Sequence, residues 1–262
     1  MSIDQRPQTT SDTSKSKLRE QVIKLRRQLE RSEAKNRALW LLLEEITDRM
    51  QISSAGIKAA VTSLLDYDIV WDGTTEHDFL EIINNNVDIV SREIMLITLA
   101  SKIETGQLEL VPEPNSIEEI ISNVVDILAS KYPDCQMKVE INANDKPVFV
   151  DFDYMVMALL FLLEFLAEIN SGIDTCRLGV NEAGSDSVIR ISNIKRHVRE
   201  LITDLEDDLT EGLIWKNSLK STDKLKLFVL GNIFAAQNID LNIHETNDLR
   251  EIRLAVPVVQ DI

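Results

Sequence analysis

An unbroken alternation of four- and three-residue steps between mostly apolar positions begins near residue 18, and it constrains the fold more than any other feature of the chain. This spacing is the heptad pattern of an amphipathic helix that packs against another helix. The pattern continues to Leu64, so we expect one helix from about Lys17 to Asp66. The predicted seam consists of Leu18, Val22, Leu25, Leu29, Ser32, Asn36, Leu39, Leu43, Ile46 and Met50, continued by Ser53, Ile57, Ala60 and Leu64.

A helix of this length seldom stands alone, because its apolar stripe would be left in water. Asn36 lies at an a position of the heptad, where a lone amide fixes a parallel, in-register dimer by a hydrogen bond between its two copies. Under the alternative interpretation, Asn36 is merely tolerated beside Ser32 in a weak part of the seam. We favour the first interpretation and predict a homodimer.

The segment DIVWDGTTEHDF interrupts the helical pattern, and Gly73 within it supplies a turn. Thr75 and Asp78 have the spacing of a helix-capping pair, so a second helix is predicted from about Glu76 to Glu104. Gly106 follows where a C-terminal cap is preferred. Two long antiparallel helices, doubled by dimerisation, predict a four-helix bundle.

Beyond residue 114 the pattern changes to short helices mixed with strands and hairpin turns, which indicates an α+β domain with helices on one face of a sheet. Helices are predicted at about 117–130, 153–169, 196–217 and 223–237, and strands at about 137–143, 147–152, 175–193 (as a hairpin), 239–245 and 250–258. The predicted organisation is a disordered tail at 1–16, a coiled coil at 17–46, a helical-hairpin dimerisation domain at 47–108 and an α/β sandwich at 115–262.

The formal net charge of the 262 residues is −16, which argues against nucleic acid as a partner, because phosphate binding requires clustered Lys and Arg. The charge is uneven, since residues 1–37 carry ten Lys and Arg against five Asp and Glu, a net of +5 that leaves −21 on the remainder. A basic helix can touch an anionic surface, but we favour a solvated flank of the coiled coil.

Cys135 and Cys176 fit neither a disulfide framework nor a metal cluster, because no Cys or His lies at ligand spacing from either. We expect both thiols to be reduced, as in the cytosol. The longest apolar run, Met155 to Leu163, has nine residues, whereas a membrane span needs ~20. The first residues lack the apolar core of a signal peptide. We therefore expect a cytoplasmic protein without a membrane span.

Three stretches, in order along the chain, carry a resemblance to a known family. SKIETGQLELVPEP, residues 101–114, and VDFDYMVMALLFLLEFLAE, residues 150–168, are similar to SRIESGKLELEPEP and to the helix beginning GDPDRLRQVLLNLLSNA of the sensor histidine kinases. FAAQNIDLNI and REIRLAVPV resemble the last helix and closing strands. The resemblance covers about residues 40–257. It implies a dimerisation-and-phosphoacceptor hairpin followed by an ATP-binding sandwich of the histidine-kinase type.

The family phosphorylates a histidine in a motif close to SHELRTPL, and TDRMQISS, residues 47–54, occupies that place here. The resemblance puts Asp48 at the histidine and Arg49 at the neighbouring acidic residue, so the nucleophile and its acidic helper are both lost. Phosphorylation of Asp48 itself requires a metal held by further carboxylates, and none is near in sequence, so we interpret Asp48 as a surface residue. The histidines, interpreted as surface or structural residues, are His77, His197 and His244.

The resemblance also implies that Phe161 and Phe165 stand where the family carries two asparagines that face the nucleotide, the second of which binds Mg²⁺. Magnesium takes oxygen ligands in near-octahedral geometry, and a phenyl ring offers none. We expect the two rings to fill the pocket or to extend the core.

The two glycine motifs of the family are altered as well. NIKRH stands in place of the adenine-binding DxGxG, with Asn193, Lys195 and His197 at the Asp and the two glycines, which removes an acceptor and blocks close backbone approach. KLKLF replaces the phosphate-binding GxGLGL loop. Its Lys224 and Lys226 can attract phosphates as point charges, but we favour a solvated helix start.

These four losses predict a histidine-kinase-like protein of two-component signalling that is a catalytically inactive, dimeric pseudokinase with a regulatory or scaffolding role. We predict no catalytic residue, cofactor or metal site. The expected partners are a second copy and either a receiver-domain protein or an active histidine kinase. Two alternatives stay open: a divergent histidine kinase or phosphotransferase with an unrecognised site, and a coiled-coil adaptor recruited through its basic N-terminal helix.

Overall fold

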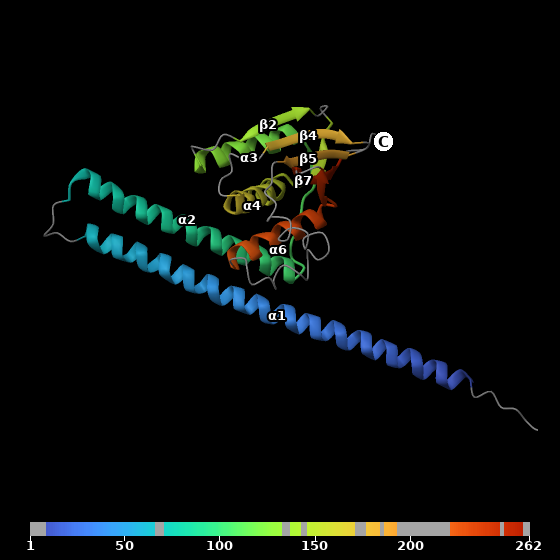
Figure 1. The fold of residues 1–262 in the computed structure, drawn as a ribbon. Helices are drawn as coiled ribbons and strands as arrows, with labels where there is room; N and C mark the ends of the chain where they lie inside the picture. Colours follow the sequence, from blue (N-terminus) through green and yellow to red (C-terminus); the bar gives the residue numbers. More distant parts are fainter. Residues whose placement is uncertain are drawn as a thin grey trace, which may run out of the picture.

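Two long antiparallel helices form one part of the molecule, and an α/β sandwich packs against them (Figure 1). Helix α1 spans Thr9–Leu64 and helix α2 spans Gly73–Glu104. We call the paired lengths of these helices the hairpin. The structure, a computed structural model, describes residues 9–65, 71–132, 137–142, 146–170, 177–183, 186–192, 221–246 and 249–258.

Both ends of α2 are capped. Asp72 is the N-cap, and its Oδ1 accepts a hydrogen bond of 2.7 Å from the backbone N–H of Thr75. This hydrogen bond lowers the pKa of Asp72. The prediction that Thr75 caps the helix is therefore wrong, because the helix begins at Gly73 and places Thr75 inside its first turn. At the other end Gly106 adopts φ +66°, as its predicted capping role requires.

Past Gly106 the chain crosses from the hairpin to the sandwich. Strand β1, Glu113–Asn115, pairs antiparallel with β3, Val148–Val150. Asp151 stabilises the segment that leads from the hairpin to the sandwich. Its carboxylate accepts hydrogen bonds from the backbone N–H of Val111 at 2.9 Å and of Tyr154 at 3.1 Å. The second bond also caps the helix that follows.

A five-stranded sheet forms one layer of the sandwich, in the order β2-β4-β5-β7-β6. Strand β2 runs parallel to β4, and the other neighbours are antiparallel. The strands are β2 Lys138–Asn142, β4 Arg177–Ala183, β5 Asp186–Ser192, β6 Asp240–Thr246 and β7 Leu249–Pro257.

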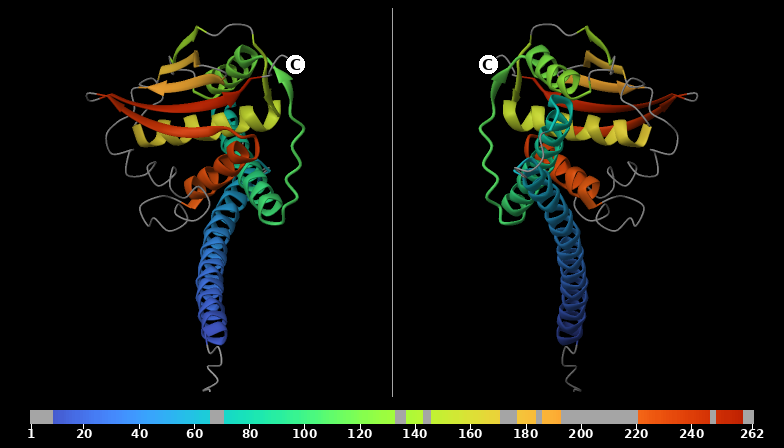
Figure 2. Two further views of the ribbon diagram at one scale, coloured as in Figure 1. Left: turned by 90° about the vertical axis from the view of Figure 1, so that its right-hand side faces the viewer. Right: turned by 90° about the vertical axis from the view of Figure 1, so that its left-hand side faces the viewer.

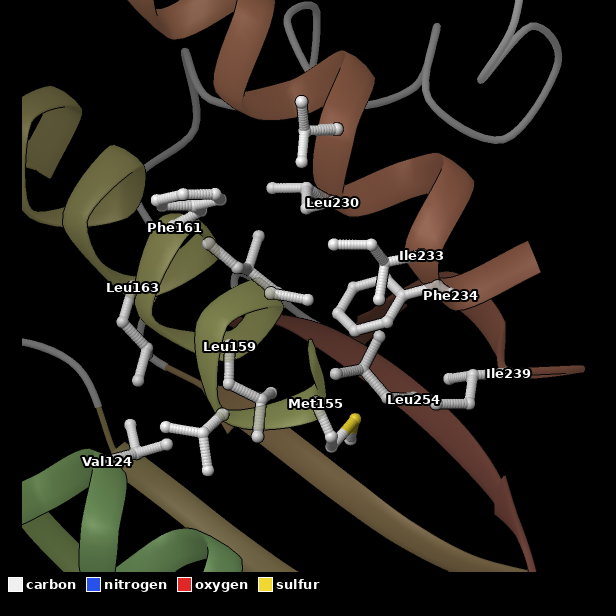
Figure 3. Packing of buried hydrophobic residues seen from close by; sticks show 14 of the residues in the cluster. Val124, Met155, Leu159, Phe161, Leu163, Leu230, Ile233, Phe234, Ile239 and Leu254 are labelled. Atoms are coloured by element: carbon white, nitrogen blue, oxygen red, sulfur yellow. The ribbon is translucent and has the colours of Figure 1, made fainter. Parts of the chain in front are cut away.

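The other layer consists of helices α3 (Ile117–Lys131), α4 (Phe152–Asn170) and α6 (Ser221–Ala236). Side chains from these helices and from alternate sheet positions form one core, which includes Met155 and Leu159 of α4 and Leu254 of β7 (Figure 3). The predicted α+β class is confirmed. The predicted helical region at 196–217 lies outside the described residues.

Helix α6 lies where the two parts of the molecule meet (Figure 2). It packs on α4 within the sandwich and also contacts α1 and α2 of the hairpin. Its residues from Thr222 to Leu230 are therefore buried all round, polar and apolar alike. The sandwich is thus joined to the hairpin mainly through one helix.

The predicted seam of α1 divides into an open and a covered half. Leu25 is 63% and Leu29 60% exposed, whereas Ile46 is fully buried. Of the other seam residues, Val22 and Asn36 are exposed and Leu43 and Met50 are half-buried, while the side chains of Leu18 and Leu39 lie outside the described part. The coiled coil and the dimer stay predictions.

Helix α1 starts at Thr9, within the segment 1–16 that was predicted to be disordered. Extending an existing helix by one residue costs far less than starting one, so a long helix can continue into a polar segment. Among the described residues, no helix is both long enough and apolar enough to cross a membrane.

Candidate functional site

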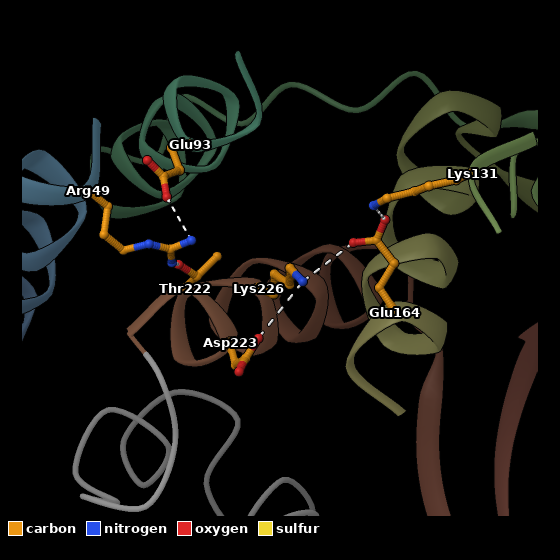
Figure 4. Close-up of polar contacts among 7 residues, drawn as sticks. All are labelled: Arg49, Glu93, Lys131, Glu164, Thr222, Asp223 and Lys226. Atoms are coloured by element: carbon orange, nitrogen blue, oxygen red, sulfur yellow. Dashed lines mark hydrogen bonds and ion pairs between the residues drawn. The ribbon is translucent and has the colours of Figure 1, made fainter. Parts of the chain in front are cut away.

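Seven polar and charged side chains meet where α6 joins the hairpin, and we call them the interdomain polar layer (Figure 4). They come from five helices: α1, α2, α3, α4 and α6. All lie at positions with ordinary helical backbone, so their approach is a result of how the helices pack. The layer consists of Arg49, Glu93, Lys131, Glu164, Thr222, Asp223 and Lys226.

Arg49 of α1 joins three helices at the hairpin end of the layer. Its Nη2 lies 3.3 Å from Oε1 of Glu93 in α2, and its Nη1 donates a hydrogen bond to the hydroxyl of Thr222 in α6 (Figure 4). The planar guanidinium can satisfy two acceptors at once, which an ammonium group cannot do in the same geometry. Arg49 therefore connects the hairpin to the sandwich directly.

Glu93 is a buried carboxylate with a side chain only 2% exposed. Burial raises its pKa, against the opposing charges of Arg49 and Arg92. Neither of its oxygens has a hydrogen-bond partner in the described part of the chain, so its charge is balanced by these nearby arginines. A buried carboxylate of this kind depends strongly on its counter-ion.

Lys226 and Glu164 form the other end of the layer, inside the sandwich. Nζ of Lys226 lies 3.4 Å from Oε2 of Glu164 in α4 and 3.8 Å from Oδ1 of Asp223, one turn earlier in α6. Lys131 of α3 contacts Oε1 of the same glutamate. Burial alone would raise the pKa of Glu164, but the hydrogen bond from Lys131 and the charges of the two lysines hold it below its usual value.

A cavity of about 90 Å³ lies beside the layer, between the hairpin and α6. Pockets for small molecules usually measure about 300–1,000 Å³, so this cavity is too small for a nucleotide and has room for about three waters. Its walls carry three cations and two carboxylates, which suits hydrogen-bonded water. The cavity is lined by Arg49, Ile89, Arg92, Glu93, Thr222, Asp223 and Lys226.

A larger cleft of about 1000 Å³ separates α2 from α3. Its charged residues are of both signs on each wall, with Asp88 and Arg92 on α2 and Asp126 and Lys131 on α3. This mixture does not favour one ligand charge. Sequence reasoning did not predict the cleft, because its two walls are far apart in the chain.

The structure separates the positions that the resemblance had linked to phosphate chemistry. Asp48 is exposed on α1, as expected, whereas the adjacent Arg49 points into the interdomain polar layer. The interpretation of Lys224 and Lys226 as a solvated helix start is wrong, because both are buried, with Lys226 only 2% exposed. Their burial results from the contact of α6 with α4 and the hairpin, which no local pattern reveals.

The two phenylalanines of α4 lie in the core, in agreement with the expectation that their rings extend the core. Phe161 is 4% exposed and Phe165 is fully buried. Figure 3 shows Phe161 on the side of α4 that faces α6, where Leu230 is its counterpart on that helix. No oxygen ligand for a metal comes from either position.

Several predicted residues take no part in the polar layer. His77 in the first turns of α2 and His244 in β6 are both exposed, as expected. Among the described residues, no group of three or more His, Cys, Asp or Glu side chains is placed to hold a metal ion. Asn193, Lys195 and His197 lie outside the described residues.

Sequence reasoning missed Glu93, Lys131, Glu164, Thr222 and Asp223. One signal was present for Glu164, because a lone carboxylate inside the apolar run of α4 is rarely buried unless it is paired. Glu93 and Thr222 carry no such signal. Their roles depend on contacts between helices that are distant in the sequence.

Comparison with known proteins gives structural matches only: no family model matches the chain, and neither does any characterised protein sequence. The Acinetobacter baumannii histidine kinase AdeS is similar, with 14% identity, 80% of this chain and 97% of that chain covered, and a TM-score of 0.52. Full-length ShkA in complex with AMPPNP matches at 10% identity over 86% of this chain and 46% of that chain, with a TM-score of 0.52.

A complex of the histidine kinase ThkA with the response regulator TrrA also matches, at 15% identity over 98% of this chain and 69% of that chain, with a TM-score of 0.49. The match to AdeS extends over both the hairpin and the sandwich. The chain therefore has the fold of the dimerisation and catalytic domains of histidine kinases. This confirms the fold that the sequence resemblance implied.

Proposed function

We propose that this chain is a histidine-kinase-like protein of two-component signalling that transfers no phosphate and acts as a dimeric regulatory or scaffolding module in the cytoplasm. A shared fold does not by itself imply a shared activity, so the proposal depends on individual sites. The observation that carries it is the burial of Phe161 and Phe165 in the core. By the sequence resemblance, these rings replace the amides that hold nucleotide and magnesium.

Two further contacts support the loss of catalysis. Arg49, which follows the proposed phosphoacceptor position, carries a guanidinium in place of the carboxylate that would assist a nucleophile, and this guanidinium is paired with Glu93. Lys226 is paired with Glu164 and Asp223 inside the sandwich. Its charge is already balanced, and an incoming phosphate would have to displace two carboxylates.

The direct test is incubation of the full chain with Mg²⁺ and ATP, followed by thermal unfolding and by measurement of radiolabel on the protein. We expect no shift of the melting temperature and no label, with an active histidine kinase as the positive control in both assays. Ligands stabilise a folded protein by mass action. A saturable shift with ATP, or phosphate on the chain, would show that the nucleotide site is functional.

The proposed homodimer is supported by apolar residues that a single chain leaves in water. Leu80, Val87 and Ile94 recur every seven residues along α2 and are all exposed, as are Leu25 and Leu29 on α1. Residues at this interval lie on one helix face and are typical of helix–helix contacts. Sedimentation velocity over a dilution series should show a reversible dimer, and a monomer at every concentration would contradict this part.

The proposed signalling partner is a receiver-domain protein or an active histidine kinase. The first would dock on the hairpin, and the second would form mixed dimers through the same apolar helix faces. Affinity purification with mass spectrometry distinguishes the two. If a receiver domain is recovered, it is phosphorylated with radiolabelled phosphate and incubated with this chain. Absence of radiolabel on this chain supports a scaffold, whereas transfer of radiolabel to it would identify a phosphotransferase.

A second candidate function is a coiled-coil adaptor, which the open half of α1 favours. Residues 1–37 are basic and carry the exposed Leu25 and Leu29. Deletion of these residues separates the two functions. If the shortened chain still dimerises but loses its cellular location, the adaptor function is preferred over the regulatory module.

A further inference from the structure

The contact of α6 with the hairpin has a separate consequence that does not depend on the proposed function. We infer that Arg49 is a latch: its guanidinium holds the sandwich on the hairpin in one closed arrangement by binding Glu93 of α2 and Thr222 of α6 together. Without this bridge the sandwich can swing away from the hairpin while each part stays folded.

The packing around α6 explains why a polar bridge has this importance. The joint between α6 and the hairpin contains the cavity of about 90 Å³ and, further along, an apolar pocket of about 300 Å³. Leu225 of α6 lines that pocket opposite Leu43 and Ile97 of the hairpin. Around these pockets the joint is apolar, because Leu96 and Leu99 of the hairpin belong to the same buried cluster as Leu225 of α6. Apolar contact is non-directional, so the directional contacts of Arg49 are the ones that can fix the orientation of the two parts.

Arg49 bridges the hairpin and the sandwich, and solvent can reach it. Its side chain is 40% exposed, so it can leave its partners without unfolding either part. The contacts of Lys226 with Glu164 and Asp223 lie inside the sandwich, where these side chains are at most 9% exposed. The layer therefore has a permanent half within the sandwich and a releasable half at the hairpin.

Release has a defined electrostatic consequence. Glu93 would lose the neighbouring cation Arg49, and Arg92 and Lys226 would be the remaining positive groups that line the cavity, which Asp223 also lines. A buried carboxylate that loses its counter-ion is costly. The hairpin and α6 then separate until water reaches Glu93, which converts a local substitution into a change of domain arrangement.

The test measures the arrangement directly. Spin labels are placed at the exposed positions Lys58 of α1 and Asn242 of β6, in a full-length chain with Cys135 and Cys176 replaced by serine, and the distance distribution is recorded by pulsed electron resonance. The labelled chain that keeps Arg49 should give one narrow distance distribution. Arg49→Ala should raise the population of longer or broader distances about tenfold or more. A hydrogen bond to a charged group stabilises one arrangement by enough free energy to change a population ratio by about this factor.

Two variants make the result specific. Asp48→Ala changes the exposed neighbour of Arg49 and should keep the narrow distribution. The exchange of charges in Arg49→Glu with Glu93→Arg should restore it, because the pair is rebuilt in reverse and a glutamate can accept from the Thr222 hydroxyl. Sedimentation of the same samples separates domain opening from a change in self-association.

The inference is overturned if Arg49→Ala leaves the distribution unchanged, or if the charge exchange leaves the molecule as open as Arg49→Ala does. If Arg49→Ala fails to fold, the same distance measurement is made on Arg49→Lys. Lysine keeps the positive charge but lacks the planar guanidinium that can donate to two acceptors at once. We expect an intermediate opening for it, and an unchanged distribution would overturn the latch.

Discussion

Helix α6 and the N-terminal half of α1 are opposites in sequence pattern and in burial. The N-terminal half of α1 has the clearest apolar periodicity in the chain, yet Leu25 and Leu29 are exposed. Helix α6 has almost no periodicity, yet its residues from Thr222 to Leu230 are buried. Periodicity indicates that a helix packs on one face. It does not indicate whether the partner belongs to the same chain, and it disappears when a helix is covered all round.

The largest expected effect tests the charged interior of the covered region. Glu164→Gln removes the carboxylate that Lys131 and Lys226 share and leaves Lys226 its 3.8 Å contact with Asp223. Breaking such a buried pair costs about 3–5 kcal/mol. The measurement is urea unfolding of the full chain.

The control for this change is Glu251→Gln, which removes a carboxylate whose 2.5 Å contact with Arg253 is much more exposed. Exposed ion pairs contribute about 0–1 kcal/mol. Equal losses of unfolding free energy in the two variants would mean that the interdomain polar layer is no more important to folding than the sheet surface.

The same substitution placed in both regions tests the comparison itself. Leu227→Ala in α6 removes a fully buried side chain and should lower the unfolding free energy by about 2–5 kcal/mol. Leu25→Ala should change that free energy by less than about 0.5 kcal/mol, because the side chain is exposed in the single chain.

Leu25→Ala should instead weaken self-association, which sedimentation velocity over a dilution series measures. A loss of several kcal/mol from Leu25→Ala at high dilution would mean that the open half of α1 is covered within its own chain. Unchanged self-association would remove Leu25 from the proposed dimer contact.

Local patterns predicted most of the fold. Strands β4 to β7 lie where the β-hairpin and the closing strands were predicted, and Gly106 was identified because few other residues accept a positive φ. The cap of α2 was assigned to Thr75 and proved to be Asp72, since both residues suit the role and the choice depends on where the helix begins.

The candidate site was much less predictable. Arg49, Glu93 and Thr222 are far apart in the sequence, and none breaks the pattern of its own helix. Their contact depends on how the sandwich sits on the hairpin. The same cause made Lys226 look like a solvated residue at the start of a helix, when it is paired with Glu164 of α4. Side-chain pairings between domains require the tertiary structure.

The pH dependence of stability separates Glu164 from the exposed carboxylates. Its pKa in the folded protein lies below the ordinary value of 4.5, so its stabilisation is complete above about pH 4.5 and is lost as the pH falls through the folded-state pKa. The free-energy difference between the unmodified chain and Glu164→Gln should therefore shrink on acidification. A constant difference from neutral pH to pH 3 would contradict the paired, ionised state of Glu164.

The smallest effect concerns the backbone that leads from the hairpin to the covered region. Gly106→Ala should destabilise the chain by about 1 kcal/mol, because φ +66° is unfavourable for a residue with a Cβ atom. Its N–H donates to the carbonyl of Ile103 at 3.1 Å, and the N–H of Gln107 donates to that of Lys102 at 2.7 Å, so this conformation closes the end of α2.

Gly73→Ala is the matched control at the other end of α2. A Cβ atom there meets nothing within 4 Å, and the φ angle is ordinary, so the substitution should stabilise the chain by about 0.4–1 kcal/mol through the unfolded state. The two alanines should thus shift the melting temperature in opposite directions. If both raise it, the positive φ at Gly106 does not constrain the crossing, and the direction in which the chain enters the sandwich is set by the contacts of Asp151 with Val111 and Tyr154 instead.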